Sequence, residues 1–145
     1  MKSKEIIIFA LVTIGILSSC AKVPKLQVPS VKPTPKYELG GLYLTTDAKQ
    51  MSGVARDSIK LGVGESAVIY ARGMSTIETG GKWFELPSDV VVNWKADREL
   101  EVTPTVGHVV TVKVVRPISG AAYLTATTTD KSGKKIESIL AVTMK

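Results

Sequence analysis

The chain has 145 residues, enough for one domain with short appendages. Its composition, 44% hydrophobic and 22% charged, is typical of a folded protein and excludes a wholly disordered chain. The net charge of +6 is unevenly placed, because residues 21–36 hold four lysines and no acid, whereas residues 37–145 hold 13 basic and 12 acidic residues. A nucleic-acid-binding domain concentrates positive charge on its folded part, so we expect no nucleic-acid partner.

The first nineteen residues have the pattern of an export signal. Lys2 and Lys4 give a positive start, and residues 6–17 form a nearly unbroken apolar run. Such a run suits the core of a signal peptide and is too short for a transmembrane helix, which needs about 20 apolar residues. We therefore expect residues 1–19 to be a signal peptide that is removed from the mature protein.

The apolar run ends in Leu17-Ser18-Ser19-Cys20, which resembles the lipobox of bacterial lipoproteins. The resemblance implies that the Cys20 thiol accepts diacylglycerol and that cleavage precedes this residue. The new amino terminus then takes a further acyl chain such as palmitate. Several acyl chains make a stable membrane anchor, since each buried methylene contributes about 0.8 kcal/mol. Cys20 is the only cysteine, so the exported domain can form no intrachain disulfide.

Residues 20–36 are expected to be the lipidated cysteine and a linker. Two interpretations of residues 21–36 stay open: a plain spacer, or a basic segment that contacts anionic lipid, lipopolysaccharide or cell-wall polymer. The lysines keep the linker solvated and extended. Four prolines break any helix and favour polyproline II: Pro24, Pro29, Pro33 and Pro35.

The residues after the cysteine bear on which membrane holds the protein. Ala21-Lys22 follows Cys20, whereas an aspartate in this place tends to retain bacterial lipoproteins in the inner membrane. The resemblance therefore implies a lipid anchor in the outer membrane rather than in the inner membrane.

From residue 37 onward, short apolar runs recur with period two and are separated by Gly, Pro, Asp and Ser clusters. No amphipathic helix pattern follows residue 20. The sequence therefore predicts an all-β domain over residues 37–145, with two antiparallel sheets packed as a sandwich. The expected strands cover residues 39–45, 57–63, 66–72, 90–95, 100–102, 109–115, 121–128 and 135–144, with a small hairpin of residues 75–79 and 82–86 around Gly80-Gly81.

Three residues are expected to shape the core of this sandwich. Trp94 is large enough to fill the space between two sheets, and its indole N–H can reach a backbone carbonyl. Gly64 permits a tight turn into a strand, and Gly120 lets the chain reverse before another.

Four motifs follow one another along the chain: Gly62-Val63-Gly64-Glu65-Ser66, Val90-Val91-Val92-Asn93-Trp94, Gly107, and Gly120 to Ala126. Their order resembles that of bacterial immunoglobulin-like domains of group 2 (BIG2). The similarity covers roughly residues 57–145 and implies an immunoglobulin-like sandwich. Such domains occur in bacterial surface proteins, including adhesins, as spacers or binding modules without a common catalytic site. The sequence departs from the family at Lys95-Ala96-Asp97, where a Ser-rich run is usual, and in the longer segment 73–88.

The sequence predicts no enzyme, no cofactor and no metal site. The single histidine, His108, is expected to be a solvated turn residue without the partners that metal binding or nucleophilic catalysis needs. Asp97, Glu99 and Glu101 alternate and are expected on one face of a short strand. That face is either solvated or meets a calcium ion or a basic partner.

Trp83 and Phe84 are the candidate binding residues. Adjacent side chains of a strand point to opposite faces, so one of these rings is exposed unless the segment folds back. An exposed aromatic ring marks a sugar-stacking or protein-docking site. In the alternative interpretation, both rings pack as a lid over one end of the sandwich.

The sequence therefore predicts a non-enzymatic lipoprotein of the cell envelope, anchored to the membrane through Cys20. Its immunoglobulin-like domain is expected to bind or position a protein or glycan partner and no small-molecule cofactor. The alternative is a structural accessory subunit or spacer of an envelope or surface assembly.

Overall fold

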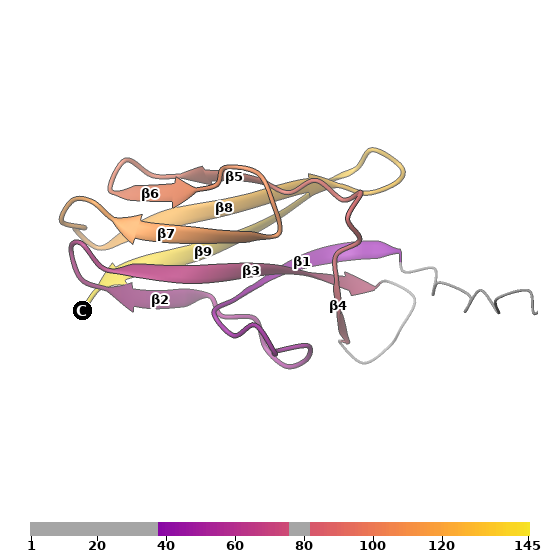
Figure 1. Cartoon of the computed structure of the whole chain (residues 1–145), viewed down its shortest axis with the longest axis horizontal. Coiled ribbons are helices and arrows are strands. Elements are labelled where there is room, and N and C mark those ends of the chain that lie inside the picture. The colour runs from indigo at the N-terminus through magenta and orange to yellow at the C-terminus, as the bar shows by residue number, and fades with distance from the viewer. Residues whose placement is uncertain (1–37, 76–81) are drawn as a thin grey trace, which may run out of the picture. The chain divides into compact units, whose positions relative to one another are not determined.

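A computed structural model describes residues 38–75 and 82–145 (Figure 1). The described residues form strands and connecting turns without a helix, which confirms the predicted all-β fold. Cys20, the linker and Gly80-Gly81 lie outside the described residues. The strands are β1 (Leu39–Thr45), β2 (Ser58–Leu61), β3 (Ser66–Ser75), β4 (Trp83–Glu85), β5 (Asn93–Ala96), β6 (Leu100–Thr103), β7 (Val109–Val114), β8 (Ala121–Thr129) and β9 (Lys135–Met144).

The strands form two sheets. The first has the order β1-β3-β7-β6, with β4 paired to the end of β3, and the second has the order β2-β9-β8-β5. All pairs are antiparallel except β2 with β9. Constant-type immunoglobulin domains have strands A, B, E and D in one sheet and C, F and G in the other. The same order occurs here, with β1, β3, β7 and β6 in one sheet and β5, β8 and β9 in the other, so the predicted immunoglobulin-like sandwich is confirmed.

The core lies between the two sheets and follows the period-two pattern of the strands. In β7, every second residue is buried while the residues between are exposed. Strand β8 alternates in the same way along its whole length. The largest side chains that are almost fully buried come from both sheets and include Leu44, Ile69, Leu124 and Leu140.

The segment before β5 differs from its prediction. A strand was expected from residue 90, but β5 begins at Asn93. The β6–β7 loop lies beside this segment, because Gly107 N–H donates to the Val92 carbonyl and Trp94 N–H donates to the Thr105 carbonyl. Val92 is nevertheless fully buried.

Strand β3 extends three residues beyond its predicted end. Its residues 72–74 pair antiparallel with β4, so this pairing begins earlier in the chain than the hairpin that Gly80-Gly81 suggested. Strand β1 pairs with the opposite edge of β3, from Leu39 opposite Ser75 to Thr45 opposite Tyr70. The C-terminal half of β3 is therefore flanked by β1 on one side and β4 on the other.

The connection from β1 to β2 crosses the outer surface of the first sheet. We call residues 46–52 the strap. The strap leaves β1, passes over β3 and reaches the far edge of β4, where Trp83 N–H donates to the Met51 carbonyl at 3.1 Å and Ser52 pairs with Lys82. A tight turn begins the strap, because Asp47 Oδ1 accepts a hydrogen bond from Lys49 N–H at 2.8 Å.

Candidate functional site

The two candidate binding residues, Trp83 and Phe84, point to opposite faces of the first sheet and are both buried. Trp83 is 5% exposed and Phe84 is 7% exposed. Phe84 belongs to the core between the sheets and lies directly against Gly73. Trp83 lies on the outer face, where its ring stacks on Tyr43 with centroids 4.8 Å apart. Both rings are therefore in packing contacts, on opposite faces of the first sheet rather than together over one end of the sandwich.

Trp83 belongs to a group of side chains that the strap partly covers. We call this group the outer cluster: Tyr43, Tyr70, Arg72, Met74 and Trp83. The Tyr43 hydroxyl donates to the Met74 sulfur at 3.0 Å. These side chains come from β1, β3 and β4 and point away from the core between the sheets, since their neighbours in β3, such as Ala71, point inward. The outer cluster is therefore a second packed region, on the outside of the sandwich.

Arg72 is the charged member of the outer cluster, and it is only 7% exposed. Its Nη2 donates to the Ala48 carbonyl of the strap at 2.8 Å, and its guanidinium carbon lies 5.4 Å from the Tyr70 ring centroid. Its Nε is buried without a hydrogen-bond partner. No carboxylate among residues 38–75 and 82–145 forms an ion pair with it.

The sequence analysis did not single out Arg72. Period two places Arg72 on the same face as Tyr70, opposite the inward-facing residues of β3, and a charge on an outward face is ordinarily solvated. The burial depends on the strap, whose path no local pattern specifies. One feature of the sequence could have indicated this burial: Arg72 lies between the large side chains of Tyr70 and Met74 on one face of the strand.

The outer face of the second sheet carries two exposed large hydrophobic residues. Tyr123 on β8 is 49% exposed and Ile139 on β9 is 52% exposed. Tyr123 pairs with Ala141 and Thr125 pairs with Ile139, so the two hydrophobic side chains are diagonal neighbours on one face. We call this surface the Tyr123 face. Its other outward residues on β8 and β9 are small or polar and include Thr125, Thr127, Ala141 and Thr143.

Lysines border the Tyr123 face. Lys95 on β5 pairs with Thr125, and Lys60 on β2 pairs with Thr143. Within the described part of the chain neither lysine has an ion-pair partner. Lys135 on β9, in contrast, pairs with Glu137 at 2.6 Å. The face therefore combines two exposed hydrophobic side chains, threonine hydroxyls and two lysines without an ion-pair partner among the described residues.

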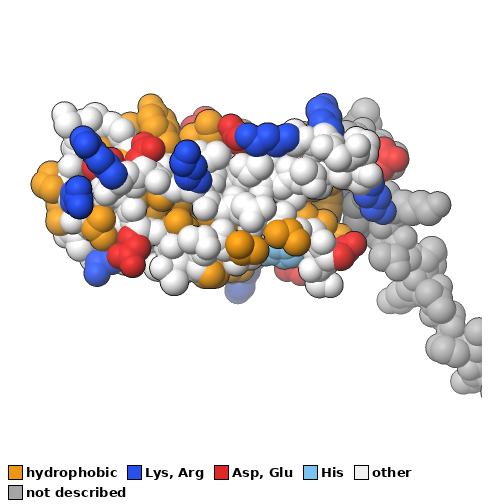
Figure 2. Space-filling view, turned by 90° about the horizontal axis from the view of Figure 1, so that it is seen from above, with side chains coloured by type: hydrophobic (Ala, Val, Ile, Leu, Met, Phe, Trp, Pro, Cys, Tyr) orange, Lys and Arg blue, Asp and Glu red, His pale blue; other side chains and the backbone are white. Residues whose placement is uncertain are grey.

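His108 links the β6–β7 loop to the segment before β5. Its Nε2 lies 2.5 Å from the Val90 carbonyl, and the residue is half-buried. His108 lies in a bend, as the sequence predicted, but it is less solvated than expected because its ring contacts this carbonyl. In the space-filling view, hydrophobic side chains gather beside the histidine (Figure 2). Val91, Val106 and Val109 are the exposed hydrophobic residues of these segments.

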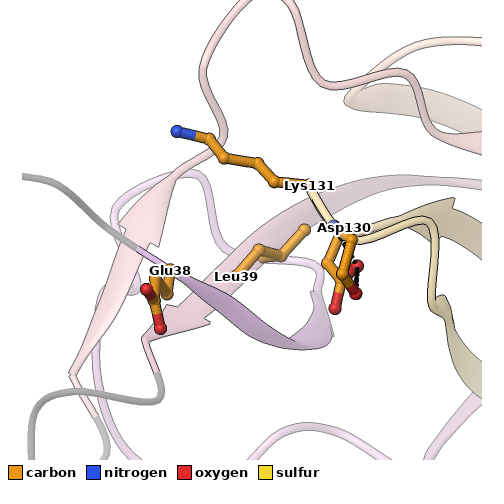
Figure 3. A pocket seen from close by; sticks show the side chains of 5 residues that line it. Glu38, Leu39, Asp130 and Lys131 are labelled. Carbon is orange, nitrogen blue, oxygen red and sulfur yellow. Dashed lines mark hydrogen bonds between the residues drawn. The ribbon is translucent and has the colours of Figure 1, made fainter.

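A hollow lies between the start of β1 and the β8–β9 hairpin. Its volume is about 310 Å³, and its lining includes Glu38, Leu39, Asp130 and Lys131. In Figure 3 the Leu39 side chain points toward the hairpin, while the Lys131 amino group points away from Asp130. Asp130 Oδ1 accepts hydrogen bonds from the Ser132 hydroxyl and from Lys134 N–H. These bonds hold the pKa of Asp130 below its ordinary value, and they stabilise the turn between β8 and β9.

The three alternating acids do not form the expected strand face. Asp97 and Glu99 precede β6, and only Glu101 lies within it. Asp97 Oδ2 accepts the Tyr123 N–H at 2.8 Å, and Glu99 forms an ion pair with Arg98. The expectation was wrong because a turn occupies residues 97–99, in which Leu100 N–H bonds to the Asp97 carbonyl. Among the residues that the structure describes, no three His, Cys, Asp or Glu side chains lie close enough to hold a metal ion.

Trp94, Gly64 and Gly120 were singled out as structural residues. Trp94 is buried in the core, and its Nε1 donates to the Gly107 carbonyl at 2.7 Å. Gly64 and Gly120 lie in exposed turns with φ of 84° and 88°. A side chain is strained in this left-handed region, which explains glycine at both turns.

No protein-family model matches the chain, and no curated protein or solved structure is significantly similar to it. The part of the chain that the structure describes contains no helix with the length and hydrophobicity that crossing a membrane requires.

Proposed function

We propose that this chain is a non-enzymatic lipoprotein of the cell envelope, whose immunoglobulin-like domain binds or positions a protein or glycan partner. In this proposal Cys20 carries the lipid, residues 21–36 tether the domain, and the anchor lies in the outer membrane. The apolar run before Leu17-Ser18-Ser19-Cys20 supports the anchor. The order of the glycine and tryptophan motifs, together with the strand order, supports a domain of the group 2 type.

The observation that carries the binding role is the exposed pair of Tyr123 and Ile139 on a flat sheet face. A tyrosine offers a hydrophobic ring and a hydroxyl, and such residues are enriched where proteins meet partners. The surrounding threonines and the two unpaired lysines offer hydrogen bonds and positive charge to a partner. A spacer has no need for a large hydrophobic pair on its solvated face, so this surface favours a binding module over the accessory-subunit alternative.

The lipid anchor is tested by metabolic labelling with an alkyne-tagged palmitate in a bacterium that expresses the chain. The wild type is expected to incorporate label, while Cys20→Ser is expected to incorporate none and to leave the membrane fraction. A separation of inner from outer membranes then tests the location. Recovery of labelled protein with the inner membrane would contradict the outer-membrane part of the proposal.

The binding role is tested by photo-crosslinking in intact cells. A photoreactive amino acid replaces Tyr123 or Ile139 on the Tyr123 face, and the control replaces Thr111, an exposed residue of β7 on the opposite sheet. The proposal expects a discrete adduct from positions 123 and 139 and none from position 111. Protease and glycosidase digestion of the adduct distinguish a protein from a glycan. Equal labelling from positions 111, 123 and 139 would contradict the assignment of the docking site to the Tyr123 face.

A further inference from the structure

We propose that Arg72 anchors a second binding site, which accepts an acidic peptide segment of a partner protein, and that the strap fills this site when the partner is absent. The proposal goes beyond the envelope function above and does not depend on the Tyr123 face. It starts from the one charged side chain of the described residues that is buried without a carboxylate partner.

The burial of Arg72 is not explained by stability alone. Arginine stays charged at any pH that a protein experiences, and a buried charge without a partner is costly. The guanidinium has five N–H donors. Among the described residues its Nη2 donates to the Ala48 carbonyl, and the group lies over the ring of Tyr70. Nε is left with no acceptor. The arrangement therefore has donor capacity that a negatively charged oxygen would use.

A carboxylate fits this capacity better than the strap does. The Ala48 carbonyl is neutral and offers one oxygen to Nη2. A carboxylate binds arginine in a bidentate manner with two parallel charge-assisted hydrogen bonds, roughly twice as strong as neutral ones. One carboxylate could therefore occupy the place of the Ala48 carbonyl and also accept from Nε. The acidic residue nearest in register, Glu85 on β4, lies opposite Arg72 but is exposed and forms no ion pair with it.

The strap shows that this surface accepts a peptide. Its contacts at β4 are main-chain contacts: Trp83 N–H donates to the Met51 carbonyl, and Ser52 pairs with Lys82 as in an antiparallel sheet. An incoming extended peptide can make the same contacts at this edge, since main-chain hydrogen bonds do not depend on the side chains that the peptide carries. A peptide that replaced residues 48–52 of the strap, with an acidic residue in the place of Ala48, would bring its carboxylate to Arg72.

The strap is suited to displacement because it buries little of itself. Residues 47–49 and 51–52 are exposed, and Thr46 and Gln50 are half-buried. Two hydrogen bonds join the strap to the Thr45 side chain of β1: the hydroxyl donates to Gln50 Oε1 at 2.6 Å and accepts from Asp47 N–H at 3.0 Å. Segments with few buried apolar contacts open at a low free-energy cost. Displacing the strap therefore exposes the Arg72 guanidinium without opening the core between the sheets.

The test follows the guanidinium directly, by recording the ¹H–¹⁵N signals of the arginine Nε groups of the mature lipoprotein in neutral detergent micelles. The chain has four arginines, and loss of one signal in Arg72→Lys assigns the Arg72 resonance. Three probes are titrated: an acetylated and amidated pentapeptide Ser-Val-Glu-Val-Thr, the same peptide with Gln in place of Glu, and glucuronate. Arg98, whose side chain is 84% exposed, provides the internal control signal.

The Glu peptide is expected to shift the Arg72 signal in a saturable manner, with the Gln peptide binding about tenfold more weakly because it lacks the charge-assisted bonds. Gln50→Ala removes the hydrogen bond between the Thr45 hydroxyl and the strap, and it is expected to tighten binding of the Glu peptide. An Arg72 signal that no probe moves would overturn the proposal. A signal that glucuronate moves as strongly as the Glu peptide would overturn the peptide assignment in favour of an acidic glycan. Lipidation and the Tyr123 face are not part of this readout, so its failure leaves the envelope proposal intact.

Discussion

Tyr43 and Trp83 stack with their ring planes 10° apart, although they belong to strands that lie on opposite sides of β3. The two rings therefore meet above β3 on the outer face of the first sheet. Their contact joins the edge strand β1 to the short strand β4, which has only three residues of ladder pairing with β3. The stack therefore adds a side-chain contact that holds β4 against the rest of the domain.

Trp83→Ala is expected to lower the free energy of unfolding by about 3 kcal/mol, the range found for loss of a buried aromatic side chain. Trp83→Phe is expected to cost less, because a phenyl ring keeps part of the stack with Tyr43. Urea unfolding followed by circular dichroism measures both variants. A Trp83→Ala variant that keeps its stability but loses a bound partner would support the original interpretation of Trp83 as a ligand platform.

Gly73→Ala is expected to destabilise the domain by about 1–3 kcal/mol through overpacking. A methyl group on Gly73 would lie 2.5 Å from Phe84 Cζ and 2.9 Å from Leu39 Cδ1, closer than atoms in contact allow. The matched control is Gly41→Ala on the neighbouring strand, where the nearest atom is the flexible end of Met74 at 3.4 Å. Chemical denaturation of the two variants under identical conditions measures the difference.

The double variant Gly73→Ala/Phe84→Leu separates overpacking from other effects of the methyl group. If the clash with the Phe84 ring is the cause, the methyl group costs less stability in the Phe84→Leu background than in the wild type. An equal cost in both backgrounds would show that the ring of Phe84 is not what makes glycine necessary at position 73.

Asp130 predicts an acid-dependent contribution to stability from the β8–β9 hairpin. The Ser132 hydroxyl, followed by Lys134 N–H, holds the pKa of Asp130 below its ordinary value. Because the folded pKa is the lower one, the stabilisation is fully present above the unfolded pKa of about 4 and is lost as the pH falls through the folded pKa.

Asp130→Asn is therefore expected to melt below the wild type at pH 7, with the difference shrinking as the pH falls below about 4. Thermal melts recorded between neutral pH and strongly acidic pH measure this convergence. Glu101→Gln, an exposed substitution on β6, is the control for a general effect of removing one negative charge. A difference that stays constant with pH would show that the Asp130 charge contributes nothing to the turn.

The period-two pattern predicted most of the sandwich because each strand buries one face. Val110, Val112 and Val114 alternate with exposed residues along β7, and Ala122, Leu124 and Ala126 alternate with less buried residues along β8. The glycine turns at Gly64 and Gly120 were also visible, since their neighbours change from one alternating run to the next. Strand alternation and glycine turns depend on neighbouring residues only, so they can be predicted from a single sequence.

The burial of the outer cluster could not be predicted in the same way. Adjacent positions in a strand correctly place Trp83 and Phe84 on opposite faces, but they do not say what covers each face. The cover over Arg72 is the strap, and the contact between the Ala48 carbonyl and Arg72 joins residues that are 24 positions apart in the sequence. The sequence therefore left the exposure of Trp83 open and did not single out Arg72.

The Tyr123 face leads to a prediction that separates binding from folding. Tyr123→Ser and Ile139→Ser each remove a half-exposed side chain from a solvated sheet face, where substitutions ordinarily change stability by no more than about 0.5 kcal/mol. If this face binds the partner, both variants are expected to lose most of the partner that copurifies with the wild type from solubilised envelopes, while their melting temperatures stay near the wild-type value. Val68→Ser, a similarly exposed position on β3 of the opposite sheet, is expected to retain the partner. Loss of the partner in Val68→Ser but not in the other two variants would move the docking surface to the first sheet, beside the outer cluster and its buried arginine.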